Sequence, residues 1–299
     1  MHEFGNPLVS IICPTYNHES YIRECLEGFV SQITSFDIEI IVHDDASTDK
    51  TVDIIKEYES KYPHLFKNVY QTENQFSKDI SSVSRIMFAK AKGKYIALCE
   101  GDDYWIDSFK LQKQIDFLEN NLNFSLCFTN FETLKNSNYT FNSKRTELNR
   151  VYKISDLIIN NPFATSTAVF RSKYTKITPD FFNSLPILDL AFYLQILKQS
   201  KSYAFVLADV TSVYRIHEGG IHGKAHLSNK HMIEAFKHRI QFWTIGLKND
   251  FLPEYKNEIR FKIISDKKIL SHHLFLEKKY FEYLFLKINI FLFKLIYCS

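Results

Sequence analysis

The sequence of 299 residues lacks an excess of charge of either sign, because 37 lysine and arginine residues are matched by 34 aspartate and glutamate residues. The formal net charge of +3 argues against a dedicated nucleic-acid-binding protein, whose surface would be strongly basic. CxxC pairs are absent, and the eleven histidines are scattered along the chain. The length suffices to bury a full hydrophobic core, either in one large domain with an appendage or in two domains.

Cysteine is scarce, and its number is odd. Most of the cysteines lie in apolar runs, and the five positions are Cys13, Cys25, Cys99, Cys127 and Cys298. We therefore expect free, buried thiols in a reducing compartment. Residues 1–7 carry neither a basic stretch nor a long apolar one, so the sequence predicts no secretory signal and a cytoplasmic protein.

Apolar runs of strand length alternate with amphipathic stretches of helix length through the first 129 residues. The predicted strands cover residues 8–13, 38–42, 68–71, 95–99 and 124–129. The predicted helices cover residues 21–32, 48–62, 81–91 and 109–121. Such alternation is typical of a parallel sheet wrapped by helices, so the expected class is α/β.

Beyond residue 130 the pattern is weaker. Residues 135–150 are rich in Asn, Ser and Lys, and they predict a mobile loop. A strand at 165–170, a helix at 187–198, and two strands at 203–207 and 210–214 are expected next. The chain then reads as helical from about residue 226 to its end. We predict a domain over 1–222, whose second half begins near 131, and a helical extension over 223–299.

Three carboxylates, Glu100, Asp102 and Asp103, directly follow the buried strand at 95–99. Carboxylates crowded at a strand end repel one another unless a cation lies between them, and strand ends are where open α/β sheets bind ligands. A hard divalent cation that meets its substrate through phosphate oxygens suits this position. The alternative is a polar turn that caps the next helix.

Two further segments end strands at the same edge of the predicted sheet. They are Pro14-Thr15-Tyr16-Asn17 and Asp44-Asp45-Ala46-Ser47-Thr48-Asp49. Together with Glu100-Gly101-Asp102-Asp103-Tyr104-Trp105, these segments resemble the successive motifs of family-2 glycosyltransferases, and the resemblance runs from about residue 8 to 220. The resemblance implies an A-type glycosyltransferase fold with a Rossmann-like, mainly parallel sheet. It also implies a nucleotide-sugar donor and inversion at the anomeric carbon.

The resemblance assigns donor-binding roles to the first two segments. Pro14, Thr15 and Tyr16 would line the pocket of the base. Asp45 matches the acid that reads uracil, and Asp44 would brace its loop. Ala46, which follows them, replaces the glycine usual in the family, and this is tolerable if its φ angle is negative.

The third segment matches the metal-binding Asp-x-Asp motif of the family. Asp102 would hold Mg²⁺ or Mn²⁺ at the donor's diphosphate, and Glu100 would lie near the ribose or the waters of the metal, although the family usually has aspartate there. Asp103 is kept among the donor-binding residues, but we expect it to cap the following helix. His217 resembles a histidine placed beside the diphosphate and metal; the alternative is a plain turn histidine before Gly219.

Asp189 matches the acid that opens the acceptor-side helix and serves as general base. A base is required because the acceptor hydroxyl loses its proton as it attacks. The alternative is a helix N-terminal acid that only complements the helix dipole. Leu188 stands where a second acid is common in the family.

The last predicted helix, over 281–297, carries an apolar stripe that includes Phe281, Leu284, Phe285, Ile288 and Leu292. It is too charged and too short to span a bilayer of ~30 Å. A helix that is apolar on most sides must still bury itself. Its own domain, a second subunit in a homodimer, or the inner face of the plasma membrane could cover it.

These observations lead to one functional hypothesis: an inverting, divalent-metal-dependent glycosyltransferase in surface polysaccharide synthesis. It would move a hexosyl or N-acetylhexosaminyl group from a UDP-sugar to a hydroxyl of a glycan or lipid-linked acceptor. Three alternatives remain open: a sugar-phosphate nucleotidyltransferase, a phosphoacceptor signalling domain and a non-catalytic sugar-nucleotide binder. The first lacks its Gly-rich loop after the first strand, and the second does not account for the acidic segment at 100–103.

Overall fold

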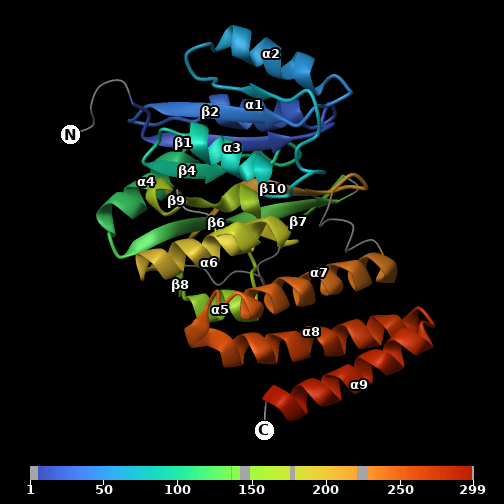
Figure 1. The fold of residues 1–299 in the computed structure, drawn as a ribbon. Helices are drawn as coiled ribbons and strands as arrows, with labels where there is room; N and C mark the ends of the chain where they lie inside the picture. The colour runs from blue at the N-terminus through green and yellow to red at the C-terminus, as the bar shows by residue number, and fades with distance from the viewer. Residues whose placement is uncertain (1–5, 136, 142–148, 176–178, 221–227, 298–299) are drawn as a thin grey trace.

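A computed structural model describes residues 6–135, 137–141, 149–175, 179–220 and 228–297 of the chain. Its centre is a sheet in the order β3-β2-β1-β4-β9-β6-β10-β5, with β7 paired to β6 and β8 to β10 (Figure 1). The strands are β1 (Val9–Thr15), β2 (Ile38–Asp44), β3 (Val69–Tyr70), β4 (Tyr95–Leu98), β5 (Tyr104–Trp105), β6 (Phe124–Lys135), β7 (Asn138–Phe141), β8 (Arg150–Tyr152), β9 (Val169–Arg171) and β10 (Tyr203–Ile216).

The longer strands of this sheet all run in one direction. β1 pairs in parallel with β2 and β4, β2 with β3, and β6 with β10. The short β9 lies antiparallel between β4 and β6, so those two neighbours keep the common direction. The remaining short strands β5, β7 and β8 are also antiparallel to their partners. The expectation of an α/β fold with a mainly parallel sheet is confirmed.

Helices cover both faces of the sheet. Successive residues of a strand point to opposite faces, so each strand contributes side chains to two hydrophobic cores. In β1, Ile11 and Cys13 face a core shared with α1 (Ile22–Val30), α2 (Thr51–Lys61) and α4 (Lys110–Asn120). Ile12 faces the opposite core, shared with α3 (Ser82–Lys90), α5 (Ile154–Ile159) and α6 (Leu188–Ser200). Both faces of the strand are buried, which explains why apolar residues dominate its sequence, and the polar Ser10 donates to Glu39 Oε1 at 2.6 Å.

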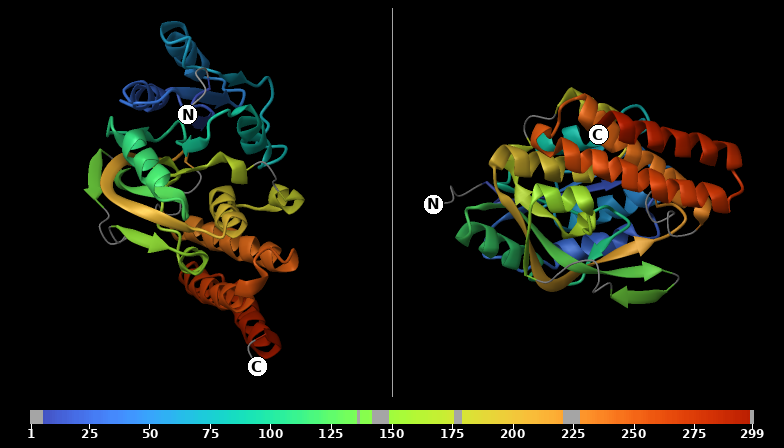
Figure 2. Two further views of the ribbon diagram at one scale, coloured as in Figure 1. Left: turned by 90° about the vertical axis from the view of Figure 1, so that its left-hand side faces the viewer. Right: turned by 90° about the horizontal axis from the view of Figure 1, so that it is seen from below.

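The C-terminal helices are α7 (Asn229–Lys248), α8 (Lys256–Leu276) and α9 (Tyr280–Tyr297). Trp243 of α7 and Ile263 of α8 belong to the same hydrophobic core as β1 and α6, so these two helices continue the main body (Figures 1 and 2). Helix α9 packs on the far side of α8 through Tyr283 and Leu286. The boundary predicted at 222 falls outside the described residues and stays a prediction.

The opposite face of α9 is covered by no described part of the chain. Phe281, Leu284 and Phe285 are 85%, 59% and 65% exposed. Of the three possible covers for this helix, the chain's own domain thus covers one face of α9. Among the helices that the structure describes, none is both long and apolar enough to cross a membrane.

Three local expectations were wrong. The region predicted as a polar loop at 135–150 contains β7 and β8, because backbone pairing to β6 and β10 does not require apolar side chains; residues 136 and 142–148 lie outside the description. The two strands expected at 203–207 and 210–214 form one strand, β10, with irregular register between Val206 and Ser212. Residues 165–167 form a 3-10 turn, and the strand begins at Val169.

Candidate functional site

The three acidic or polar segments singled out in the sequence meet at one edge of the sheet. Thr15 lies opposite Asp44 at the ends of β1 and β2. The N–H of Asp45 donates to the carbonyl of Thr15 at 3.0 Å, and the N–H of Gly101 donates to the carbonyl of Pro14 at 3.0 Å. The expectation that parallel strands bring these segments together is therefore confirmed.

Gly101 allows the segment after β4 to approach the segment after β1. A Cβ atom at this position would lie 2.7 Å from Thr15 Oγ1, 2.9 Å from Thr15 Cβ and 2.9 Å from His18 Nδ1. Contacts this short are repulsive, so a side chain here would push the two segments apart. Gly101 thereby fixes the position of the flanking carboxylates, Glu100 and Asp102, relative to the segment after β1.

Asp44 and Asp45 are both buried, and both hold backbone N–H groups. Asp44 Oδ2 accepts from the N–H of Ser47 at 3.0 Å, as expected for a residue that braces its loop. Asp45 accepts from the N–H of Gln75 at 2.7 Å and from the N–H of Phe76 at 3.0 Å. Asp45 thus ties residues 75–76 to the edge of the sheet, and each of its oxygens has a further lone pair for a ligand.

Ala46 takes a left-handed backbone conformation, with φ of 65°. The condition under which alanine would be tolerable here, a negative φ, is therefore not met. The tight turn that returns the N–H of Ser47 to the carboxylate of Asp44 places Ala46 in a region that favours glycine. An alanine here costs about 1–2 kcal/mol relative to its preferred conformations.

His18 is a site residue that the sequence analysis missed. It follows Asn17, which also has a positive φ of 55° and accepts from the N–H of Thr48 at 2.8 Å. The N–H of His18 donates to Thr51 Oγ1 at 2.8 Å. These bonds fasten the loop after β1 to the start of α2, and Nε2 of His18 lies 3.9 Å from Oδ2 of Asp102. Its position directly after the Pro14–Asn17 segment was the available signal.

Asp102 lies between two imidazoles. Its Oδ2 is 3.0 Å from Nε2 of His217 and 3.9 Å from Nε2 of His18. Burial opposes ionisation of Asp102, but the hydrogen bond with His217 and the charge of the histidines outweigh it and lower its pKa. Burial also lowers the pKa of His18, although Asp102 opposes this. The site therefore offers an ionised carboxylate with an imidazole beside it.

A divalent cation fits this arrangement. Mg²⁺ is typically held by one or two carboxylates together with the phosphates of its substrate, and Asp102 with Glu100 could supply them. His217 contacts Asp102, and its predicted place beside the diphosphate and metal stays a prediction. Within the part of the chain that the structure describes, no three His, Cys, Asp or Glu side chains form a complete metal-binding group. A cation here would need further ligands from the substrate or water.

Asp103 does not cap a helix, so that expectation was wrong. Helix α4 begins only at Lys110, and its N-terminus has no side-chain cap. Instead, Asp103 Oδ1 accepts from the N–H of Arg215 at 2.9 Å. The Arg215 side chain donates to the carbonyl of Asp102 at 2.7 Å and lies over the ring of Tyr104 at 4.2 Å. This clamp joins β10 to the acidic segment and so positions His217 beside Asp102.

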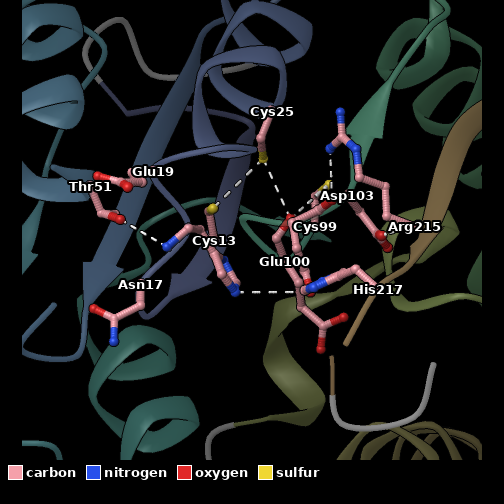
Figure 3. Close-up of polar contacts among 12 residues, drawn as sticks. Cys13, Asn17, Glu19, Cys25, Thr51, Cys99, Glu100, Asp103, Arg215 and His217 are labelled. Atoms are coloured by element: carbon pink, nitrogen blue, oxygen red, sulfur yellow. Dashed lines mark hydrogen bonds and ion pairs between the residues drawn. The ribbon is translucent and has the colours of Figure 1, made fainter. Parts of the chain in front are cut away.

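The thiols behind the acidic segment are free. Cys13 Sγ lies 3.9 Å from Cys25 Sγ, and the thiols of Cys25 and Cys99 both donate to the carbonyl of Glu100 (Figure 3). Cys127 is free and buried as well, so the expectation is confirmed for four cysteines. Cys298 lies outside the described residues. These contacts add two weak donors that hold the backbone of Glu100 in place.

Glu100 and Asp189 line one cavity of about 260 Å³. Burial, with repulsion from Asp102 and Asp189, raises the pKa of Glu100 to about 8. Asp189 lies in the first turn of α6, as predicted, and lines the same cavity. The site thus brings together two carboxylates from distant parts of the sequence.

The far wall of this cavity comes from the C-terminal helices. His238 and Arg239 of α7 and Lys262 of α8 line it. The sequence analysis missed them, because helical periodicity shows that a helix is buried but does not show which cavity it closes.

A mainly parallel α/β sheet with carboxylates at the ends of β2 and β4 is typical of proteins that bind a ligand at the edge of the sheet. Comparison with known proteins identifies the particular family. Residues 10–176 match the model of glycosyl transferase family 2, which is more than half of the chain. The chain belongs to this family.

Two relatives show the level of sequence similarity within the family. An uncharacterized protein of Mycobacterium tuberculosis is 32% identical over 237 residues, which are 77% of this chain and 65% of the relative. The chain thus spans less than two thirds of that relative's length. The UDP-Glc:alpha-D-GlcNAc-diphosphoundecaprenol beta-1,3-glucosyltransferase of Escherichia coli is 38% identical over 112 residues, which are 38% of this chain and 41% of the relative.

Among solved structures, a mannosyltransferase from Pyrobaculum calidifontis in complex with GDP-Man and Mn²⁺ matches with a TM-score of 0.61. The match covers 92% of this chain and 76% of that chain at 16% sequence identity. At this identity the likeness establishes the fold alone. The chain therefore has the A-type glycosyltransferase fold and carries C-terminal helices.

Proposed function

We propose that the chain is an inverting, divalent-metal-dependent glycosyltransferase that uses a UDP-sugar. It transfers a hexosyl or N-acetylhexosaminyl group to a hydroxyl of a glycan or lipid-linked acceptor in surface polysaccharide synthesis. The observation that carries this proposal is the shared cavity of Glu100 and Asp189, which continues the acidic segment at the end of β4. The name of the E. coli relative, with its UDP-Glc donor and diphosphoundecaprenol acceptor, supports the choice of substrates.

On the donor side, Pro14, Thr15 and Tyr16 line the base, and Asp45 contacts the uracil. Asp102, beside His217, holds Mg²⁺ or Mn²⁺, with Glu100 in its surroundings. The cation, when bound, neutralises charge that develops on the leaving diphosphate. The Mn²⁺ in the structurally similar mannosyltransferase is consistent with this assignment.

On the acceptor side, Asp189 accepts the proton of the attacking hydroxyl. It comes from the start of α6, whereas Glu100 and Asp102 come from the end of β4. Attack from the side of Asp189, opposite the leaving diphosphate, inverts the anomeric centre. A carboxylate within reach of the hydroxyl is the group this step requires.

The exposed face of α9 contacts the membrane surface. The flanking Lys278 and Lys287 are exposed and complement anionic headgroups, while Phe281 and Phe285 supply apolar area.

Thermal unfolding with UDP, GDP and CDP, each with Mn²⁺ or with EDTA, tests the donor site. A ligand at about 100 times its Kd adds about 2.7 kcal/mol of stability, and we expect this for UDP with Mn²⁺ only. Asp102→Asn should abolish it, whereas the exposed control Asp53→Asn on α2 should retain it. A larger shift with another nucleotide would refute the role of Asp45.

Asp189→Asn tests the general base. It should keep the stabilisation by UDP with Mn²⁺ but lose transfer to acceptor. Retained transfer would remove Asp189 from this role. Binding of UDP by the native chain without transfer to any glycan or lipid-linked acceptor would favour the non-catalytic sugar-nucleotide binder.

A further inference from the structure

Both acidic and basic side chains line the cavity that holds Glu100 and Asp189. Its basic wall consists of His238 and Arg239 from α7 and Lys262 from α8. These residues lie outside the region that matches the family model, which ends at residue 176. The C-terminal helices thus contribute basic side chains to the cavity at the edge of the sheet.

The charges of this wall are not balanced within it. Arg239 Nη2 lies 3.1 Å and Lys262 Nζ 3.3 Å from the same oxygen of Asp266, whose side chain is fully buried. Two cations thus share one anion, which leaves one positive charge before any contribution from His238. Lys262 also donates to the carbonyl of Ile159 at 2.8 Å. Burial and the adjacent Arg239 lower the pKa of Lys262, as expected beside excess positive charge.

A purely structural ion cluster would be expected to pair its charges, because an uncompensated buried charge is costly. Here the excess positive charge faces a cavity. A guanidinium has five N–H donors in a planar fork, which matches phosphate oxygens. Arg239 uses one nitrogen toward Asp266 and has others that could face the cavity.

The size of the cavity limits its occupant. Its volume of about 260 Å³ is just below the ~300–1,000 Å³ typical of pockets for drug-sized ligands. One sugar-sized unit with an attached anion fits better than an oligosaccharide. The carboxylate of Asp189 lies in the same cavity and would repel an anion from its own side, so the anion belongs at the basic wall.

We propose that Arg239 and Lys262, with His238, bind a phosphoryl group of the acceptor and so place the acceptor hydroxyl at Asp189. That the bound ligand is an acceptor rests on the proposed transfer reaction. That the ligand carries a phosphoryl group does not rest on that reaction. The phosphoryl group could belong to a lipid-linked sugar diphosphate or to a phosphate within a glycan polymer. In either case these residues position the substrate and take no part in proton transfer.

The first experiment measures binding without metal or nucleotide. N-acetylglucosamine 1-phosphate and neutral N-acetylglucosamine are titrated into the full chain with EDTA, by calorimetry. Arg239→Gln and Lys262→Gln should each weaken binding of the phosphate at least tenfold, the range expected for a charged hydrogen bond. Lys268→Gln, an exposed lysine on α8, is the matched control and should have no effect. The neutral sugar should bind weakly and equally to every variant.

A second variant guards against misfolding, because Arg239→Gln alone leaves Asp266 with one partner fewer. The triple change Arg239→Gln/Lys262→Gln/Asp266→Asn removes both cations together with the anion they share, and it should also lose phosphate binding. Asp102→Asn should keep it. Phosphate binding that survives the triple change, or that is lost only in Asp102→Asn, would overturn the proposal by placing the phosphate at the acidic segment.

The second experiment identifies the source of the phosphoryl group. Transfer by the chain with Mn²⁺ and UDP-sugar is compared on a lipid-linked sugar diphosphate and on a phosphate-containing polymer. Arg239→Gln should raise the KM for the true acceptor and leave the KM for the donor unchanged; a raised donor KM would refute the assignment. If no acceptor is glycosylated but phosphate binding still depends on Arg239, the proposed function fails while the phosphoryl site stands.

Discussion

A fully buried lysine beneath the acidic segment gives a quantitative test of the structure. Lys110, the first residue of α4, donates to Gln114 Oε1 at 2.6 Å and lies over the ring of Trp105 at 4.5 Å. Trp105 closes the segment that begins at Glu100. Burial lowers the pKa of Lys110 from its ordinary value of 10.5 to about 7.

This change in pKa implies a pH-dependent stability. Between pH 7 and 10.5 the unfolded chain binds a proton that the folded chain has released, so this group makes stability rise with pH across that window. Below pH 7 the full penalty for the buried ammonium applies. At about 1.4 kcal/mol per pH unit, the difference between 10.5 and about 7 corresponds to roughly 5 kcal/mol.

Lys110→Met removes the penalty and keeps an unbranched chain of similar length. At pH 6 we expect the variant to gain up to about 5 kcal/mol, less about 1 kcal/mol for the lost hydrogen bond to Gln114. The gain should shrink by about 1.4 kcal/mol for each pH unit above 7. The variant has no ammonium group at position 110, so protonation at this position no longer lowers its free energy of unfolding at low pH.

Urea unfolding at pH 6, 7, 8 and 9 measures this difference, with Lys113→Met as the control on the same helix. Lys113 is paired with Asp107 and Asp209, which raise its pKa, so its variant should show a difference that hardly changes over this range. A constant difference for Lys110→Met across the four pH values would refute the assignment of a buried, readily deprotonated lysine.

Three further changes probe the site and its surroundings. Ala46→Gly should raise the free energy of unfolding by about 1 kcal/mol, because φ is 65° there, and an unchanged urea midpoint would contradict the turn. Gly101→Ala should cost about 1–3 kcal/mol through its clash with Thr15 and should lower UDP affinity with Mn²⁺; native affinity by calorimetry would contradict the close approach. Phe285→Ser should lower the affinity for anionic vesicles, measured by co-sedimentation, about tenfold or more, and Leu122→Ser is the exposed control. An equal loss of affinity in both variants would argue against contact through α9.

The sequence predicted the edge of the sheet well because its signals are local. A buried strand reads as a short apolar run, and its end is marked by the polar residues that follow, as at Asp44 and Glu100. Parallel pairing then requires these ends to meet, and the structure confirms it.

What the sequence could not provide depends on contacts between distant segments. The bond from Arg215 to Asp103 spans 112 positions, so local spacing favoured the wrong interpretation of Asp103 as a helix cap. The φ angle of Ala46 follows from the turn at Asp44, which residue type alone does not report. The apolar periodicity is weak after residue 130 for a related reason. The polar residues of β7 are held in the sheet by backbone pairing with β6, which the periodicity of β7 itself does not show.

The wall that α7 and α8 contribute to the cavity has a consequence for how these proteins diversify and how they are engineered. The family match covers residues 10–176, whereas Asp189, Arg239 and Lys262 lie beyond it. The family model therefore does not reach every residue that lines this cavity. Under the proposed acceptor site, a chimera intended to exchange acceptor choice between two relatives would have to carry α7 and α8 along with the loops, because Arg239 and Lys262 lie on those helices.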